Sequence, residues 1–250
     1  MTTAASQYPL IGSQPVGNFF QPDTTQRHAL GSVLAFNDPY WGGGEAIYLQ
    51  MPTSTALQAG TVLAYDTAAG FVASAVANTA NLGKSLAVLM NYVPSNASAQ
   101  FAWAYIMGSV PVYSTASVAA DTALGIAAAG QAGANSAGKE ILNARSTKPA
   151  TTTVTKSNAQ TTNGSALLRV SNSDGLFVGC PISGTGIPAT TYIGAISSDG
   201  RTITMTQSDL ATAQTATASG AITLTGTYND GTKFWNVVTF NRPLAQGAIT

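Results

Sequence analysis

The residue types that carry most enzyme chemistry are rare in this 250-residue chain. His28 is the only histidine and Cys180 is the only cysteine. A Ser-His-Asp triad, a histidine general base or a histidine-based zinc site would all depend on His28, which lies beside Arg27 with no evident partner. A single cysteine excludes both an intramolecular disulfide and a cysteine-based zinc site. We therefore expect no catalytic residue and no metal site, with His28 at a surface or interface and Cys180 as a small buried hydrophobic residue.

The acidic side chains also give little support to an enzyme. They are scattered singly, mostly in turn sequences, where an Asp usually accepts hydrogen bonds from its own backbone. No Asp-x-Asp-x-Asp run indicates a calcium site. A glycan hydrolase needs two converging carboxylates, and the nearest candidates, Asp174 and Asp199, both lie in Asp-Gly turns.

One glycine pattern formally matches a nucleotide-binding motif. The sequence from Gly184 to Ala189 fits Gly-x-Gly-x-x-Ala, but a dinucleotide site needs a strand before this motif and a helix after it. Pro188 and the Thr-rich sequence that follows disfavour a helix. We interpret the segment as a hairpin turn and expect no cofactor.

Charge is unusually scarce in the chain. Only 8% of the residues are charged, against roughly a quarter in ordinary globular proteins. The formal net charge is zero, and a weakly charged surface favours association, so we expect assembly with copies of the same chain or with a larger body. The ten Lys and Arg residues argue against a nucleic-acid partner and against an electrostatic membrane anchor. The N-terminal sequence has no signal-peptide pattern, which predicts synthesis in a cytoplasm.

Short apolar segments separated by turn signals predict an all-β protein. Phe101, Trp103 and Tyr105 alternate with alanines along the chain, which predicts that the three aromatic side chains share one buried face of a strand. The alanine-rich stretch 115–138 contains glycines every few residues, so we expect loop and short strand there, with at most a helical turn or two near 117–123. Other predicted strands are 61–65, 71–76, 85–93, 110–113, 141–145, 166–170, 177–182, 191–196, 202–206, 221–225 and 233–240.

Shifts in composition divide the chain into four parts. Residues 1–27 predict an extended N-terminal arm, and 28–146 a β-barrel or sandwich-like domain. A small β-sandwich-like module is expected at 147–225, and a C-terminal strand or tail at 226–250. That strand could return to the first domain, which would make the module an insertion, or it could pair with a neighbouring subunit.

The segment from Leu30 to Gln50 holds two short apolar runs joined by a turn-rich loop. Asn37, Asp38 and Pro39 initiate the turn, and a run of three glycines follows Tyr40 and Trp41. We therefore expect two strands with both aromatic residues at the tip of the loop. Their side chains could anchor a partner surface, or the loop could fold back over its own core.

Two stretches resemble one known family. The first is Tyr40-Trp41-Gly42-Gly43-Gly44-Glu45-Ala46-Ile47-Tyr48-Leu49, and the second is Gln14-Pro15-Val16-Gly17-Asn18-Phe19-Phe20-Gln21-Pro22-Asp23-Thr24-Thr25-Gln26-Arg27-His28. They are similar to sequences in the decoration (cement or head-stabilisation) proteins of tailed bacteriophages. The resemblance covers the arm and the first domain. It implies a structural virion protein on the capsid exterior, a major capsid protein as partner, a homotrimer and stabilisation of the expanded shell. The expected interface residues are Phe19, Phe20, Tyr40 and Trp41, with Trp235 as a weaker choice.

A second function remains open at this point. The sequence from Val178 to Pro188 resembles a small β-module that recurs in phage virion proteins and fibres. The chain could therefore be a virion fibre or a receptor- or carbohydrate-binding module. Exposed aromatic residues in 164–225 would favour that function, and Phe177 and Tyr192 are the ones available.

Overall fold

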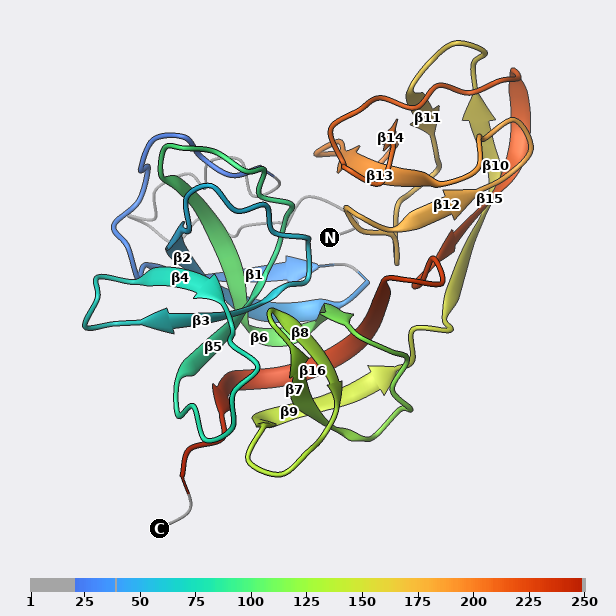
Figure 1. The fold of residues 1–250 in the computed structure, drawn as a ribbon. Coiled ribbons are helices and arrows are strands. Elements are labelled where there is room, and N and C mark those ends of the chain that lie inside the picture. The colour runs from blue at the N-terminus through green and yellow to red at the C-terminus, as the bar shows by residue number, and fades with distance from the viewer. Residues whose placement is uncertain (1–20, 39, 249–250) are drawn as a thin grey trace.

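The computed structural model describes residues 21–38 and 40–248 (Figure 1). These residues form sixteen strands and no helix, which confirms the all-β prediction. The strands build two units: a ten-stranded sheet that wraps on itself and a closed barrel of six strands.

The larger unit is a strongly wrapped, mostly antiparallel sheet that includes two parallel strand pairs. Extra pairings of β2 and β5 with β6, and of β16 with β9, close it into two five-strand circuits that share β6. One circuit is β2-β4-β3-β5-β6 and the other is β16-β6-β8-β7-β9. Its strands are β1 (Val33–Asp38), β2 (Gly42–Met51), β3 (Val62–Asp66), β4 (Val72–Ala75), β5 (Ser85–Leu89), β6 (Gln100–Ser114), β7 (Ala123–Ala128), β8 (Gln131–Ala134), β9 (Glu140–Lys148) and β16 (Phe234–Ala245).

Strand β6 passes through the middle of this unit and is buried on both faces. Trp103 and Tyr105 lie in one hydrophobic cluster, with Phe101 packed against it, as their alternation predicts. Ala104 and Ile106 point to the other side, into a second cluster. Because both faces carry apolar residues, the strand reads as a continuous hydrophobic run. The predicted strand that carries Phe101, Trp103 and Tyr105 and the strand predicted at 110–113 are one continuous strand.

The smaller unit is a barrel with strand order β10-β11-β14-β13-β12-β15. It closes completely, so the expectation of a sandwich-like module is corrected to a barrel. The interior is filled by apolar side chains that include Leu168, Ile193, Ile203, Met205 and Leu224. Its strands are β10 (Thr153–Thr161), β11 (Leu167–Arg169), β12 (Pro181–Ser183), β13 (Thr191–Ile196), β14 (Thr202–Thr206) and β15 (Gly220–Thr227).

The C-terminal strand returns to the larger unit of its own chain. β16 pairs antiparallel with β6 from Phe234–Ser114 to Asn241–Met107, and with β9 on its other side. The barrel is therefore an insertion between β9 and β16, and Figure 1 shows the chain passing from β15 in the barrel to the long red strand β16 in the larger unit. β9 continues to Lys148, two residues beyond the boundary expected at 146, and the Thr-rich stretch after it forms β10.

The alanine-rich stretch contains no helical turn. It forms loop and then the hairpin of β7 and β8, in which Gly125 lies opposite Gly133. A Cβ on Gly133 would lie 2.6 Å from Ala127 Cβ and 2.7 Å from Thr115 Oγ1. The glycines thus allow a tight hairpin, and they also make a helix unfavourable.

Candidate interaction surfaces

The first described residues are pinned to the larger unit through Asp23. Its backbone exchanges two hydrogen bonds with Phe101, at 2.7 and 2.9 Å. Its carboxylate is 8% exposed and accepts hydrogen bonds from Arg27 Nε at 2.9 Å and from the Tyr48 hydroxyl at 2.8 Å. A carboxylate buried this far needs such partners to offset its lost hydration. The end of the predicted arm is therefore fixed to β2 and β6.

His28 packs among aromatic side chains. Its ring lies edge-on to Tyr48, with centroids 5.1 Å apart, and 5.3 Å from Trp103. Nε2 is buried without a hydrogen-bond partner among the described residues. The ring thus helps to hold the Asp23 segment by packing, and it is half-buried, which leaves the expected surface or interface position open.

The loop between β1 and β2 is organised by Asp38. Its Oδ1 accepts hydrogen bonds from the backbone N–H groups of Tyr40, at 2.8 Å, and Trp41, at 2.9 Å. This confirms the turn role expected of this aspartate. The two aromatic residues pack edge-to-face, with centroids 4.6 Å apart, and Lys148 Nζ lies 5.0 Å from the Tyr40 ring centroid.

Trp41 is buried by the inserted barrel rather than by its own unit or by a partner. Its side chain is 9% exposed and belongs to the cluster that fills the barrel, with the Tyr228 ring 6.2 Å away. Tyr40 is 39% exposed. The interface role expected of Trp41 is therefore corrected to an internal contact, whereas Tyr40 is accessible.

Trp235 is also an internal residue. Its side chain is 1% exposed, and Nε1 donates to the carbonyl of Ala59 at 3.0 Å. The ring lies 5.7 Å from both Tyr113 and Phe177. Because it is enclosed by both units, it is not available to another chain, which corrects the expected interface role. The two other candidates, Phe19 and Phe20, lie outside the described residues.

Asn236 follows Trp235 and connects separate segments of the chain through its polar side chain. Its side chain is fully buried, and Oδ1 accepts hydrogen bonds from the N–H groups of Val118 at 2.8 Å and Ala150 at 2.9 Å. Nδ2 donates to the carbonyl of Ala116 at 2.9 Å. One amide therefore ties β16 to the loop before β7 and to the chain that enters the barrel. No sequence motif marks this residue.

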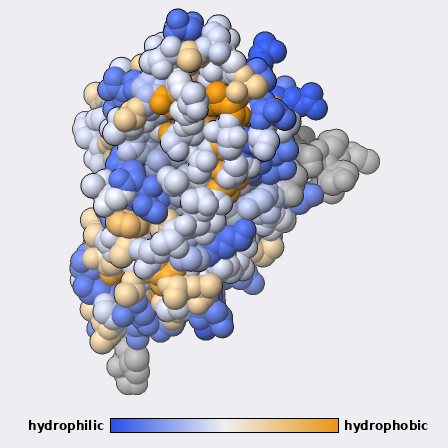
Figure 2. All heavy atoms as spheres, turned by 90° about the vertical axis from the view of Figure 1, so that its right-hand side faces the viewer, coloured by the Kyte–Doolittle hydropathy of each residue, from blue (hydrophilic) through white to orange (hydrophobic). Residues whose placement is uncertain are grey.

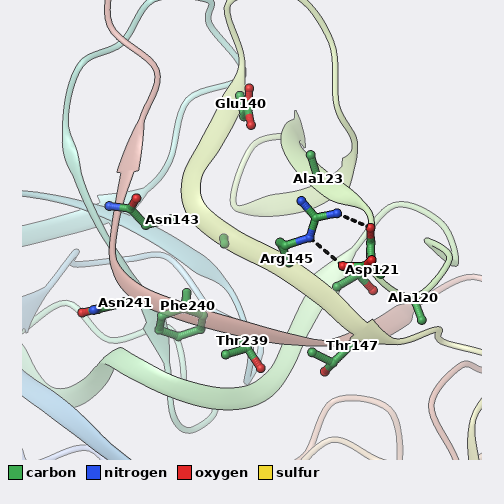
Figure 3. Close-up of a pocket in the computed structure, with 12 residues that line it drawn as sticks. Ala120, Asp121, Ala123, Glu140, Asn143, Arg145, Thr147, Thr239, Phe240 and Asn241 are labelled. Atoms are coloured by element: carbon green, nitrogen blue, oxygen red, sulfur yellow. Dashed lines mark hydrogen bonds and ion pairs between the residues drawn. The ribbon is translucent and has the colours of Figure 1, made fainter.

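An open groove of about 770 Å³ lies over β9 and β16 (Figure 3). The register between these strands shifts from Phe240 to Leu244, and Asn143 and Arg242 adopt left-handed backbone conformations there. Arg145 Nε donates to Asp121 Oδ1 at 2.8 Å at one end of the groove. Small, apolar, hydroxyl and amide side chains line the rest of the groove, together with the carboxylate of Glu140.

The remaining chemical candidates are structural. No group of three or more His, Cys, Asp or Glu side chains that could hold a metal occurs within 21–38 and 40–248. Cys180 is fully buried, and burial raises the pKa of its thiol to about 12. Asp199 caps its own turn by accepting from Ser197 Oγ and the Arg201 N–H.

The barrel does not present the two aromatic residues that a recognition function would use. Phe177 is 3% exposed and Tyr192 is 5% exposed, and the Tyr192 hydroxyl donates to Asp230 Oδ2 at 2.6 Å. Figure 2 shows a face dominated by residues of intermediate hydropathy, with small groups of strongly hydrophilic and hydrophobic residues. In the described part of the chain, no helix is long and apolar enough to cross a bilayer.

Comparisons with protein-family models, curated proteins and solved structures found no match for this chain.

Proposed function

We propose that this protein is a capsid decoration protein: a structural component that binds the outside of a tailed-phage shell and stabilises its expanded form. The observation that carries the proposal is the place of the residues that resemble this family. Tyr40 to Leu49 form the end of the β1–β2 loop and most of β2, and β2 pairs with β1, β4 and β6 in the larger unit. The second resembling stretch ends in the segment that Asp23 and His28 fix beside the same strands.

The physical character of the molecule supports a mechanical role. Several of its polar side chains hold turns, as Asp38 and Asp199 do, or connect distant segments, as Asn236 does. A charge content of 8% with zero net charge favours contact with a protein surface over long-range electrostatic attraction. The major capsid protein is the partner that the resemblance implies, with the decoration protein as a homotrimer.

The mechanism follows from mass action. A protein that binds the expanded shell, and not the unexpanded one, stabilises the expanded shell by an amount that grows with its free concentration. No chemical step is required. Tyr40, exposed at 39% on the β1–β2 loop, is the described residue that we assign to the shell contact.

The first test is the copy number of this protein in purified virions, measured by quantitative mass spectrometry against the major capsid protein. A ratio approaching one to one supports the proposal, because a decoration protein covers the whole shell. A few copies per particle would overturn it and favour a fibre, vertex or tail component.

Binding to shells in two states provides the second test. Purified protein should co-sediment with expanded shells stripped of it, and not with unexpanded shells. It should also raise the temperature at which packaged particles release DNA. Tyr40→Ala should weaken binding, while Leu167→Ala, which changes an exposed apolar residue on the barrel, should not. Equal binding to both shell states would contradict the mechanism.

A further inference from the structure

Strand β1 is the open edge among the described strands. Within residues 21–38 and 40–248, each of the other fifteen strands pairs with at least two neighbours, whereas β1 pairs with β2 alone. Wrapping of the large sheet and closure of the barrel give every other described strand a neighbour on both sides, although β4 meets β2 at one residue pair only, Gln50 opposite Val72. Among the described strands, β1 is therefore the one with a side that has no neighbour, where a strand from another chain can extend the sheet.

The residues that face this open edge can be identified from the ladder. Tyr48 N–H donates to the Ser32 carbonyl at 2.9 Å, and Val33 lies opposite Ile47 in the same register. Hydrogen-bonded and non-hydrogen-bonded pairs alternate along an antiparallel ladder. The backbone groups of Leu34 and Phe36 thus point toward β2, and those of Val33, Ala35 and Asn37 point outward.

This edge lacks the usual protection against strand pairing. Natural edges carry lysines, prolines or bulges that block another strand. The sequence from Val33 to Asn37 has no charge and no proline, and its register with β2 is continuous. Val33 is 47% exposed, and Ala35 and Asn37 are also exposed.

We propose that the edge pairs with β1 of a second copy of this chain, in an antiparallel arrangement with two-fold symmetry. Among the described strands a second copy offers β1 as its own open edge, so sheet continuation between copies has to be isologous. The outward-facing residues fix the register: Ala35 lies opposite its own equivalent, and Val33 lies opposite Asn37 of the other copy. No charge opposes this pairing.

The contact is small, because only five residues of each strand take part. It lies below the roughly 1,000 Å² that a stable interface needs, so the dimer forms reversibly with concentration and strengthens when copies are held close together. Its two-fold symmetry makes it distinct from the three-fold contact of the proposed homotrimer. The inference concerns the isolated protein and holds independently of the proposed function.

Cysteine cross-linking under mild oxidation tests both the pairing and its register. Residues in a hydrogen-bonded antiparallel pair have Cα atoms about 5.5 Å apart, within the range of about 4.4–6.8 Å that a disulfide spans. Ala35→Cys should therefore form a covalent dimer by itself. The wild-type protein is the matched control, because its single Cys180 is fully buried.

Two further variants test the register. Val33→Cys and Asn37→Cys should each fail to form dimers alone, because each is four residues, or about 14 Å along the strand, from its own equivalent. A mixture of the two should yield the mixed disulfide. Cross-linking of Ala35→Cys no greater than that of Thr162→Cys, an exposed site on the barrel, would overturn the proposal, as would dimers of Val33→Cys alone.

Reversible association gives a test without cross-linking. Ala35→Pro removes an outward N–H and leaves the β1–β2 hydrogen bonds intact, which an edge strand tolerates. Sedimentation equilibrium should show that Ala35→Pro no longer dimerises as its concentration rises, while Ala35→Thr still does. Two other occupants of the edge would also overturn the proposal. If Ala35→Cys cross-links only after residues 1–20 are deleted, those residues occupy the edge. If the thiol of Ala35→Cys is protected from alkylation only when the protein is bound to particles, a shell protein occupies it.

Discussion

The rings of Trp235 and Phe177 lie with their centroids 5.7 Å apart, and through this contact the beginning of β16 joins the inserted barrel to the larger unit. The same indole donates from Nε1 to Ala59, a residue of the larger unit, at 3.0 Å. Trp235 thus packs against one unit while it hydrogen-bonds the other. The joint is apolar and closed to solvent, since both aromatic side chains are almost fully buried.

Truncation of this joint should destabilise the whole chain. Trp235→Ala removes a buried indole and leaves a cavity, which typically costs about 3–5 kcal/mol of unfolding free energy. Chemical denaturation followed by circular dichroism measures the loss. Leu167→Ala, at a side chain that is 53% exposed, serves as the control and should stay within about 0.5 kcal/mol of wild type. Equal losses of unfolding free energy for the two variants would show that the contact of Trp235 with Phe177 does not stabilise the chain.

Asn236 should be as sensitive as a large core residue despite its modest size. Asn236→Ala leaves the N–H groups of Val118 and Ala150 and the carbonyl of Ala116 without the partner that the amide provides. Each buried polar group left unsatisfied costs about 1–3 kcal/mol, so we expect a loss of more than 2 kcal/mol in the same assay. Asn135→Ala, at an exposed residue, is the matched control. A small effect at both positions would mean that water replaces the lost amide.

The sequence predicts the fold class and many strands well because their signals are local. Alternation in Phe101, Trp103 and Tyr105 predicts the buried face of β6, and the bounds of β13 and β14 coincide with the apolar runs at 191–196 and 202–206. Asp38 and Asp199 act in turns, as their neighbours suggest.

The surface candidates are harder to predict, because burial of an aromatic residue depends on contacts between distant parts of the chain. Trp41 and Trp235 look suitable for an interface until the barrel is inserted beside them. The path of β16 back to β6 is likewise a long-range event, with Phe234 pairing to Ser114 across the sequence. The open edge at β1 emerges only from the complete set of pairings, since no local pattern shows which strands have two neighbours.

Alkaline pH should lower stability through buried groups that cannot ionise in the folded chain. Burial raises the pKa of Cys180 from 9.0 to about 12 and that of Tyr48 from 10.0 to about 12. Above pH 9 the unfolded chain releases the thiol proton while the folded chain retains it, so unfolding becomes more favourable as pH rises from about 9 to 12. The contribution of Cys180 approaches 1.4 kcal/mol per pH unit in that window.

A variant that lacks the thiol isolates this contribution. Cys180→Ala should be less stable than wild type at pH 8, because it loses buried volume, but its stability should fall less steeply between pH 9 and pH 10. Urea denaturation at each pH measures the two slopes. Parallel curves for the two proteins would contradict the assigned role of the thiol.

The glycine run at the start of β2 should tolerate substitution at one position and not at the next. A Cβ on Gly44 would lie 2.5 Å from Phe36 Cζ and closer still to the Met107 carbonyl oxygen. Gly44→Ala therefore has to displace β1 or β6, and we expect a loss of about 1–3 kcal/mol, as for other overpacked sites. Gly43 is exposed, and its Cβ would meet only the Phe36 carbonyl oxygen at 3.8 Å. Gly43→Ala is thus the matched control and should be nearly neutral in thermal denaturation. If both substitutions were neutral, the close approach of β1, β2 and β6 at Gly44 would not be a constraint on the fold.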